Sequence, residues 1–117
     1  MEQIKNMVKT AYEALEDKKA NDIIILDISD ISTLADYFII CNGSNDSQVH
    51  ALTDNVEEKM HASGFRQERR EGHRNSSWIL LDYEDVIIHI FDAENREFYN
   101  LERIWRDAKQ INLEDLK

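Results

Sequence analysis

The sequence contains no proline, three glycines and a single cysteine among its 117 residues. No stretch rich in Gly, Ser or Pro is typical of a linker, so we expect a single domain over residues 1–117. One cysteine excludes a disulfide framework. Cys41 lies inside the apolar run 37–41, where a thiol usually behaves as a small buried hydrophobe.

Long apolar runs and basic residues are also scarce. No run approaches the roughly 18 residues that a membrane span needs, and charges alternate with hydrophobic residues at the N-terminus, so we expect a cytoplasmic protein without membrane contact. Acidic residues number 24 against 14 basic ones, which gives a net charge of -10. This charge disfavours direct nucleic-acid readout. It permits a basic protein partner, although solubility alone also explains it.

Apolar residues at helical spacing predict three helices, the first over residues 3–17. A second helix carries the stripe Val49, Leu52, Val56 and Met60. Ser44 or Asn45 is placed to cap its start, and Gly64 stands where a left-handed residue ends a helix. A third helix is predicted over residues 95–109 from Phe98, Leu101, Trp105 and Ala108, followed by a polar tail.

Continuous apolar runs predict the strands. Residues 23–26 and 37–41 are typical of central strands covered on both faces, and the Ser-, Thr- and Asp-rich segment between them predicts a structured connection. In residues 65–71, the charged Arg66, Glu68 and Arg70 alternate with their neighbours, which favours a polar edge strand. Residues 78–81 and 86–91 predict a β-hairpin closed by the four residues between them.

The order of elements is therefore α-β-β-α-β-β-β-α. This mixture indicates the α/β (α+β) class, with a mixed β-sheet and packed helices in one domain. Parallel pairing is expected where the second helix lies between two strands, because parallel neighbours need a long crossover.

Several segments, in this order and spacing, resemble the Iojap-like ribosomal silencing factors over about 100 residues. No single motif carries the likeness; it rests on the whole series. The segments are Asp22-Ile23, Leu26-Asp27, Ala35-Asp36-Tyr37-Phe38-Ile39-Ile40, Gly43-Ser44, Gln48-Val49, Glu71-Gly72, Trp78-Ile79-Leu80-Leu81-Asp82-Tyr83, Asp85-Val86-Ile87-Ile88-His89-Ile90-Phe91 and Arg96-Glu97-Phe98-Tyr99-Asn100-Leu101-Glu102.

The resemblance implies a nucleotidyltransferase-like mixed sheet and a homodimer in the free state. It also implies binding to large-subunit ribosomal protein fourteen at the subunit-joining face, which would block the small subunit and lower translation when nutrients are limited. A role in large-subunit assembly is the alternative. The family pattern has Gly where this chain has Glu84, and often Gly near Asn75, so we expect local differences there.

A nucleotidyltransferase-like enzyme is the rival hypothesis. Gly43-Ser44, between a strand and a helix, is an arrangement that can hold a phosphate at a helix N-terminus. Such enzymes also need paired carboxylates on a strand to hold magnesium. Asp82 and Glu84 come nearest but fall in the predicted turn. We therefore expect a non-enzymatic protein without cofactor or metal.

Trp78 and His89 are the leading binding candidates in the hairpin. A four-residue loop would place Trp78 directly across from His89, and a three-residue loop would place it across from Ile90. Tryptophan is common both in cores and at interface hot spots, and the resemblance favours docking. A histidine on a sheet face is more often hydrogen-bonded within the fold than a ligand or a base, and no second ligand lies at metal-binding spacing on its strand.

Other candidates are weaker. Tyr99 lies off the apolar stripe of the third predicted helix, so its ring is expected at a surface. Arg96 and Asp85 would pair with charges on a partner, although solvated charges explain them equally well. For Asp36, capping the preceding turn outweighs a binding role. The predicted partner-binding set is Trp78, Leu80, Asp85, His89, Arg96 and Tyr99.

Overall fold

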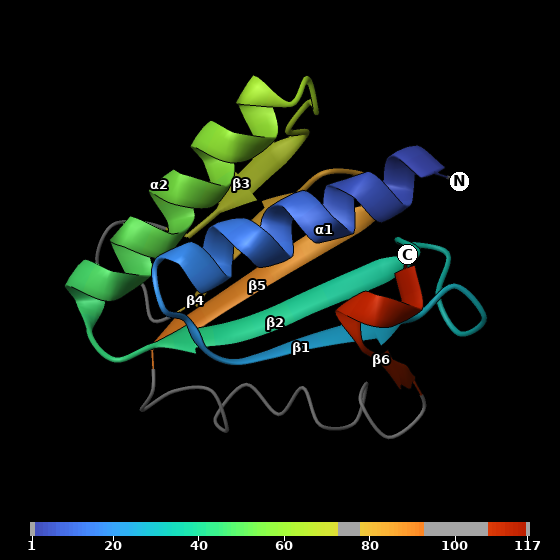
Figure 1. The fold of residues 1–117 in the computed structure, drawn as a ribbon, viewed down its shortest axis with the longest axis horizontal. Coiled ribbons are helices and arrows are strands. Elements are labelled where there is room, and N and C mark those ends of the chain that lie inside the picture. Colours follow the sequence, from blue (N-terminus) through green and yellow to red (C-terminus); the bar gives the residue numbers. More distant parts are fainter. Residues whose placement is uncertain (1, 73–77, 93–107, 117) are drawn as a thin grey trace.

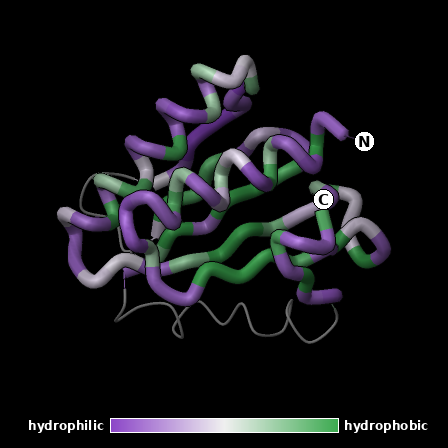
Figure 2. The backbone as a smooth tube through the Cα atoms, viewed as in Figure 1, coloured by the Kyte–Doolittle hydropathy of each residue, from purple (hydrophilic) through white to green (hydrophobic). Residues whose placement is uncertain are grey.

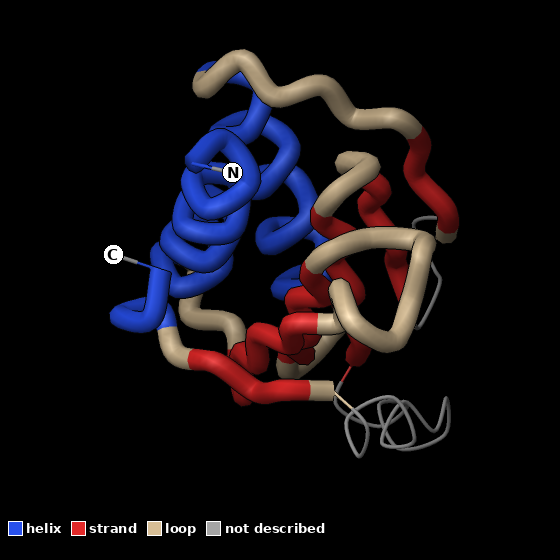
Figure 3. The backbone as a smooth tube through the Cα atoms, turned by 90° about the vertical axis from the view of Figure 1, so that its right-hand side faces the viewer, coloured by secondary structure: helices blue, strands red, loops and turns tan. Residues whose placement is uncertain are grey.

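The computed structural model describes residues 2–72, 78–92 and 108–116, which form a layer of two helices on a six-stranded mixed sheet (Figure 1). Helices α1 (Glu2–Asp17) and α2 (Asp46–Ala62) cover the same face of the sheet, as the side view in Figure 3 shows. The predicted mixed sheet with packed helices is confirmed. The strands are β1 (Asn21–Asp27), β2 (Tyr37–Gly43), β3 (Arg69–Glu71), β4 (Trp78–Asp82), β5 (Val86–Asp92) and β6 (Lys109–Ile111).

The strand order is β3-β4-β5-β2-β1-β6. β2 runs parallel to β5, and the crossover between them contains α2, as predicted. The other neighbours pair antiparallel. β1 and β2 are both interior strands, which agrees with their continuous apolar runs. Of the predicted edge strand 65–71, only Arg69–Glu71 forms a strand, and it lies at the edge with all three residues exposed.

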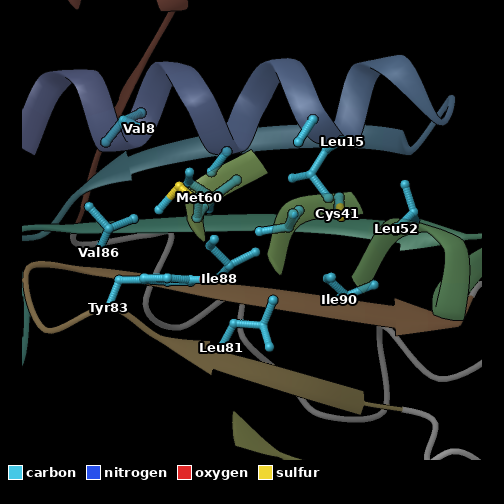
Figure 4. Close-up of a cluster of buried hydrophobic side chains, with 14 of the residues drawn as sticks. Val8, Leu15, Cys41, Leu52, Met60, Leu81, Tyr83, Val86, Ile88 and Ile90 are labelled. Atoms are coloured by element: carbon cyan, nitrogen blue, oxygen red, sulfur yellow. The ribbon is translucent and has the colours of Figure 1, made fainter. Parts of the chain in front are cut away.

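Apolar side chains are buried on both faces of the sheet. Between the sheet and the helices, Val8 and Leu15 of α1 meet Leu52 and Met60 of α2 over Ile88 of β5 (Figure 4). In Figure 2 the interior strands are the most hydrophobic part of the chain. A second buried cluster occupies the opposite face and comprises Leu26, Ile28, Ala35, Phe38, Ile40, Ile87 and Phe91.

The ends of α2 match the sequence signals. Asn45 is the N-cap, and its side chain accepts from the Gln48 N–H at 2.9 Å. Gly64 adopts φ 84° after the last turn, and the Phe65 N–H reaches the Met60 carbonyl, which is the hydrogen bonding of a Schellman end. Lys19 takes the same left-handed position after α1, at φ 61°.

The predicted register of the β4–β5 hairpin is wrong. Trp78 pairs with Phe91 rather than with His89 or Ile90, and Leu80 pairs with His89. The loop is shorter than either alternative, because the Tyr83 N–H still bonds to the Val86 carbonyl at 2.9 Å. The Asp85 N–H then bonds to the Tyr83 carbonyl, which makes a γ-turn. Glu84 lies at its centre with φ 71°, a left-handed conformation that glycine adopts more readily.

The prediction of a polar tail after a third helix is also wrong. Residues 95–107 of the predicted helix 95–109 lie outside the described residues. Lys109, its expected last residue, instead begins β6, which pairs antiparallel with β1, and a 3-10 helix (Leu113–Leu116) buries Leu116 in the core beneath α1. The alternation that marks a strand cannot be recognised in three residues.

Candidate partner-binding site

Three of the predicted docking residues lie together on the sheet face opposite the helices. Trp78 and Leu80 point to the same side of β4, two residues apart, and His89 of β5 lies directly across from Leu80. The Trp78 indole N–H donates to His89 Nδ1 over 3.1 Å. We call Trp78, Leu80 and His89 the docking face.

Aromatic rings fix the geometry of the docking face. The Trp78 ring is nearly parallel to that of Phe91, with centroids 5.6 Å apart, and the Phe38 ring meets His89 edge-on at 4.6 Å. Such pairs add about 0.5–1.5 kcal/mol each beyond the area that they bury. The tryptophan is therefore held both by stacking and by its hydrogen bond.

Burial separates the roles of these side chains. Trp78 and Leu80 are half-buried, so part of each side chain can meet a partner. His89 is only 3% exposed, and burial lowers its pKa from 6.5 to about 4. Because Nδ1 accepts a hydrogen bond, the proton of the neutral ring belongs on Nε2, a buried atom that has no hydrogen-bond partner among the residues that the structure describes. His89 is thus a buried histidine on a sheet face that orients Trp78 by accepting its hydrogen bond.

Glycine at position 72 allows the chain to lie close to Trp78. Gly72 adopts φ 101°, and a Cβ added there would come within 2.5 Å of the Trp78 carbonyl oxygen. Any other residue would push the start of β4 away. The Glu71-Gly72 pair of the sequence therefore has a structural role beside the docking face.

The other predicted docking residues are placed differently. Asp85 lies in the β4–β5 turn, half-buried, and its carbonyl accepts from the N–H groups of Asp36 (2.9 Å) and Tyr37 (3.1 Å). It lies just before β5, at the opposite end of that strand from Phe91, so it is not next to Trp78. Arg96 and Tyr99 lie outside the described residues.

The connection between β1 and β2 is structured, as predicted. The Ile28 N–H bonds to the Asp36 carbonyl at its base, and the N–H groups of Ile31 and Ser32 both bond to the Ile28 carbonyl. Ile28 and Ala35 anchor it in the buried cluster of the docking-face side. Asp36 contributes through its backbone. Burial raises the pKa of Tyr37, and the negative charges of Asp27 and Asp36 raise it further.

The features that suggested an enzyme are accounted for locally. At the start of α2 the Ser44 N–H donates to the Gln48 side chain, whose amide in turn donates to the Lys18 and Lys19 carbonyls. These contacts join the start of α2 to the end of α1. Among the residues that the structure describes, no three His, Cys, Asp or Glu side chains gather to hold a metal ion.

A hollow of about 790 Å³ lies beside the end of α2, and none of the predicted docking residues lines it. Three of its polar side chains, those of Glu57, Gln67 and Tyr83, are paired within the fold. Glu57 is paired with Arg70 at 3.1 Å, and the Tyr83 hydroxyl donates to Gln67 at 2.9 Å. Burial, followed by the Glu57 charge, raises the pKa of Tyr83, so it stays protonated.

Sequence reasoning missed the two rings that contact the Trp78–His89 pair, Phe91 against Trp78 and Phe38 against His89. Phe91 was counted as a strand residue, and its contact with Trp78 depends on the register that the turn sets. Phe38 reaches His89 because β2 and β5 are parallel neighbours. The sequence offers no local signal for either contact.

The comparisons with known proteins agree over almost the whole chain. The family model described as "Ribosomal silencing factor during starvation" matches residues 1–117. The ribosomal silencing factor RsfS of Bacillus subtilis is 39% identical over 110 residues, covering 94% of this chain and 93% of that protein. In the described part of the chain, no helix is long and apolar enough to cross a membrane.

Two solved structures share the fold. A crystal structure of a protein from Chromobacterium violaceum superposes with a TM-score of 0.85 at 37% identity, covering 91% of this chain and 88% of that one. One from Bacillus halodurans gives 0.82 at 32% identity, covering 92% and 97%. The family match, the 39% identity and the shared fold together show that this chain belongs to the family of ribosomal silencing factors.

Proposed function

We propose that this chain binds the large ribosomal subunit through large-subunit ribosomal protein fourteen and sterically prevents the small subunit from joining. Translation is thereby repressed, above all when nutrients are limited. The protein acts in the cytoplasm by occupying a surface and not by catalysing a reaction, and it is a homodimer when free.

The observation that carries the proposal is the half-buried Trp78 beside Leu80, oriented by His89. A large aromatic side chain that is fixed before binding loses little freedom on docking, and tryptophan is enriched among interface hot spots. A net charge of -10 favours encounter with a basic protein. Membership of the family of ribosomal silencing factors supports the ribosome as the binding partner.

The test is sedimentation of the purified protein with separated large subunits, with small subunits, and with both together at a stated salt concentration. Migration with large subunits alone, and fewer joined ribosomes, is the expected result. Migration with small subunits, or with neither, would overturn the proposal. Large subunits that form normally but fail to join small subunits indicate silencing. A defect in the formation of large subunits indicates an assembly role.

Substitutions then test the docking face. Trp78→Ala should weaken binding by about thirtyfold or more, which corresponds to about 2 kcal/mol at a hot spot. Trp78→Phe keeps a ring opposite Phe91 but loses the donor to His89, so it should fall between wild type and Trp78→Ala. Glu58→Ala, on the exposed side of α2, is the control and should bind as wild type. Circular dichroism confirms that each variant is folded, and unchanged affinity in Trp78→Ala would remove the docking face from the proposal.

A further inference from the structure

The connection between β1 and β2 presents two aliphatic side chains to solvent. Leu34 is 73% exposed and Ile31 is 47% exposed, and they are the large hydrophobic residues that stand out as exposed among those described. Single exposed hydrophobic residues are ordinary on protein surfaces. Two within four positions of one short connection make an apolar tip, the name used here for Ile31 and Leu34.

The apolar tip is held in shape. The Leu34 N–H donates to Ser32 Oγ at 3.1 Å, and the Ile31 N–H bonds to the Ile28 carbonyl at 3.0 Å. The end of the connection is tied to the β4–β5 turn through the bond from the Asp36 N–H to the Asp85 carbonyl. An apolar group fixed before binding loses less conformational entropy when a partner covers it.

The apolar tip belongs to the same side of the sheet as the docking face. Ile28 and Ala35, at the two ends of the connection, are buried in the cluster against which Trp78 and Leu80 pack. In Figure 3 the end of the sheet that carries this connection faces the viewer. The helices cover one face of the sheet in this view. Trp78 pairs with Phe91 at the far end of β5, so a single partner that meets both must extend along the length of the strands.

The surroundings of the apolar tip are acidic. Segment 27–36 contains three aspartates and no Lys or Arg, and the adjoining turn 82–85 contains three further acids and no base. The raised pKa of Tyr37, caused by burial and then by Asp27 and Asp36, reports the same negative field. Lys109 of β6, in register with Asp27, is a cation beside this end. Such a rim attracts a basic surface and repels a second copy of a chain with net charge -10.

We propose that the apolar tip is a second contact for the basic large-subunit protein of the proposed function, with Ile31 and Leu34 entering an apolar hollow that basic side chains surround. Asp30 and Glu84, both exposed, face those basic side chains. The inference rests on the proposed function and extends its interface along β4 and β5, from the end that carries Trp78 to the end that carries the β4–β5 turn.

The experiment measures binding of Leu34→Ser and of the double variant Ile31→Ser with Leu34→Ser to purified large subunits, by sedimentation over a range of concentrations. We expect about tenfold weaker binding for the first and about thirtyfold for the second. Gln3→Ser, an exposed neutral position on α1, is the matched control and should bind as wild type. Leu34→Lys adds a positive charge and should bind more weakly than Leu34→Ser.

The outcomes separate this inference from the proposed function. Loop variants that bind within twofold of wild type would overturn the apolar tip as a contact, while Trp78→Ala independently decides the docking face. If the loop variants change the sedimentation of the free protein but not its affinity for large subunits, the occupant is a second copy and the inference is wrong. If the wild-type protein fails to bind large subunits, both are overturned.

Discussion

At the scale of single residues, the pair formed by Trp78 and His89 connects the stability of the fold with the proposed binding site. His89 is buried on the sheet face and accepts the Trp78 N–H at Nδ1, and within residues 2–72, 78–92 and 108–116 its Nε2 has no partner. Protonating Nδ1 would remove that acceptor and place a charge where little water reaches it. The histidine therefore holds Trp78 in place only while it is neutral.

This arrangement predicts that the protein loses stability as the pH is lowered through a defined window. The pKa of His89 is lowered from 6.5 to about 4 in the folded chain, so below pH 6.5 the unfolded chain takes up a proton before the folded one does. The free energy of unfolding should drop by roughly 2 kcal/mol between pH 7.5 and pH 5 and level off below about pH 4. Urea denaturation at a series of pH values measures this drop.

Two variants isolate the histidine. His89→Gln removes the titrating group and should flatten this part of the pH dependence, whatever its own stability at pH 7.5. His61→Gln, on the exposed side of α2, should keep the wild-type profile. An unchanged slope in His89→Gln would show that other groups cause the loss.

At the scale of elements, the β4–β5 hairpin sets the position of the docking face. The γ-turn at Tyr83–Asp85 fixes which residues of the two strands meet, and the Asp82 side chain supports the turn by accepting from the Glu84 N–H at 2.8 Å. Glu84 occupies a left-handed conformation at φ 71° that a residue with a Cβ rarely adopts. The turn therefore has a local strain that glycine would relieve.

Glu84→Gly should raise the free energy of unfolding by about 1 kcal/mol, because glycine adopts positive φ without steric cost. Glu84→Ala removes the same charge but keeps a Cβ, and it should give no such gain. Thermal or urea denaturation of the two variants at pH 7.5 measures the difference. Equal stability of Gly and Ala at this position would mean that φ strain is absent.

At the scale of the whole molecule, charge and surface determine what can bind. A net charge of -10 creates a field that steers a basic partner and opposes contact with bare phosphate. Both edges of the sheet are three-residue strands, and Arg69–Glu71 carries a charge at every position. Short charged edges resist pairing with other chains. The sheet face and the end with the β4–β5 turn are then the surfaces best suited to a partner.

Steering predicts a salt dependence. Raising monovalent salt from about 50 to about 300 mM at fixed magnesium should slow association with large subunits by about tenfold, with a smaller effect on dissociation. Stopped-flow or surface-based kinetics measures both rates. Asp30→Asn should reduce the salt dependence more than Glu13→Gln, an equal charge change on exposed α1. Association that does not respond to salt would argue against a basic partner.

The sequence by itself determined the parts of this protein that depend on near neighbours. Helical spacing located α1 and α2, and Ser44 or Asn45 at the start and Gly64 at the end marked the limits of α2. Continuous apolar runs located β1 and β2, and the acidic balance permitted a basic partner without requiring one. These signals can be recognised in the sequence because the helical period of 3.6 residues, the strand period of two and the chemistry of a helix cap are properties of a short segment.

Only the tertiary structure decided how those parts meet. The register that sets Trp78 against Phe91, the addition of β6 beside β1 and the contact of Phe38 with His89 join residues distant in sequence. Each depends on a turn of one or two residues or on a neighbour in the sheet, and a change of one position in register moves every side chain of a strand to the other face. The burial of His89 and the exposure of Ile31 and Leu34 follow from that packing and not from residue type.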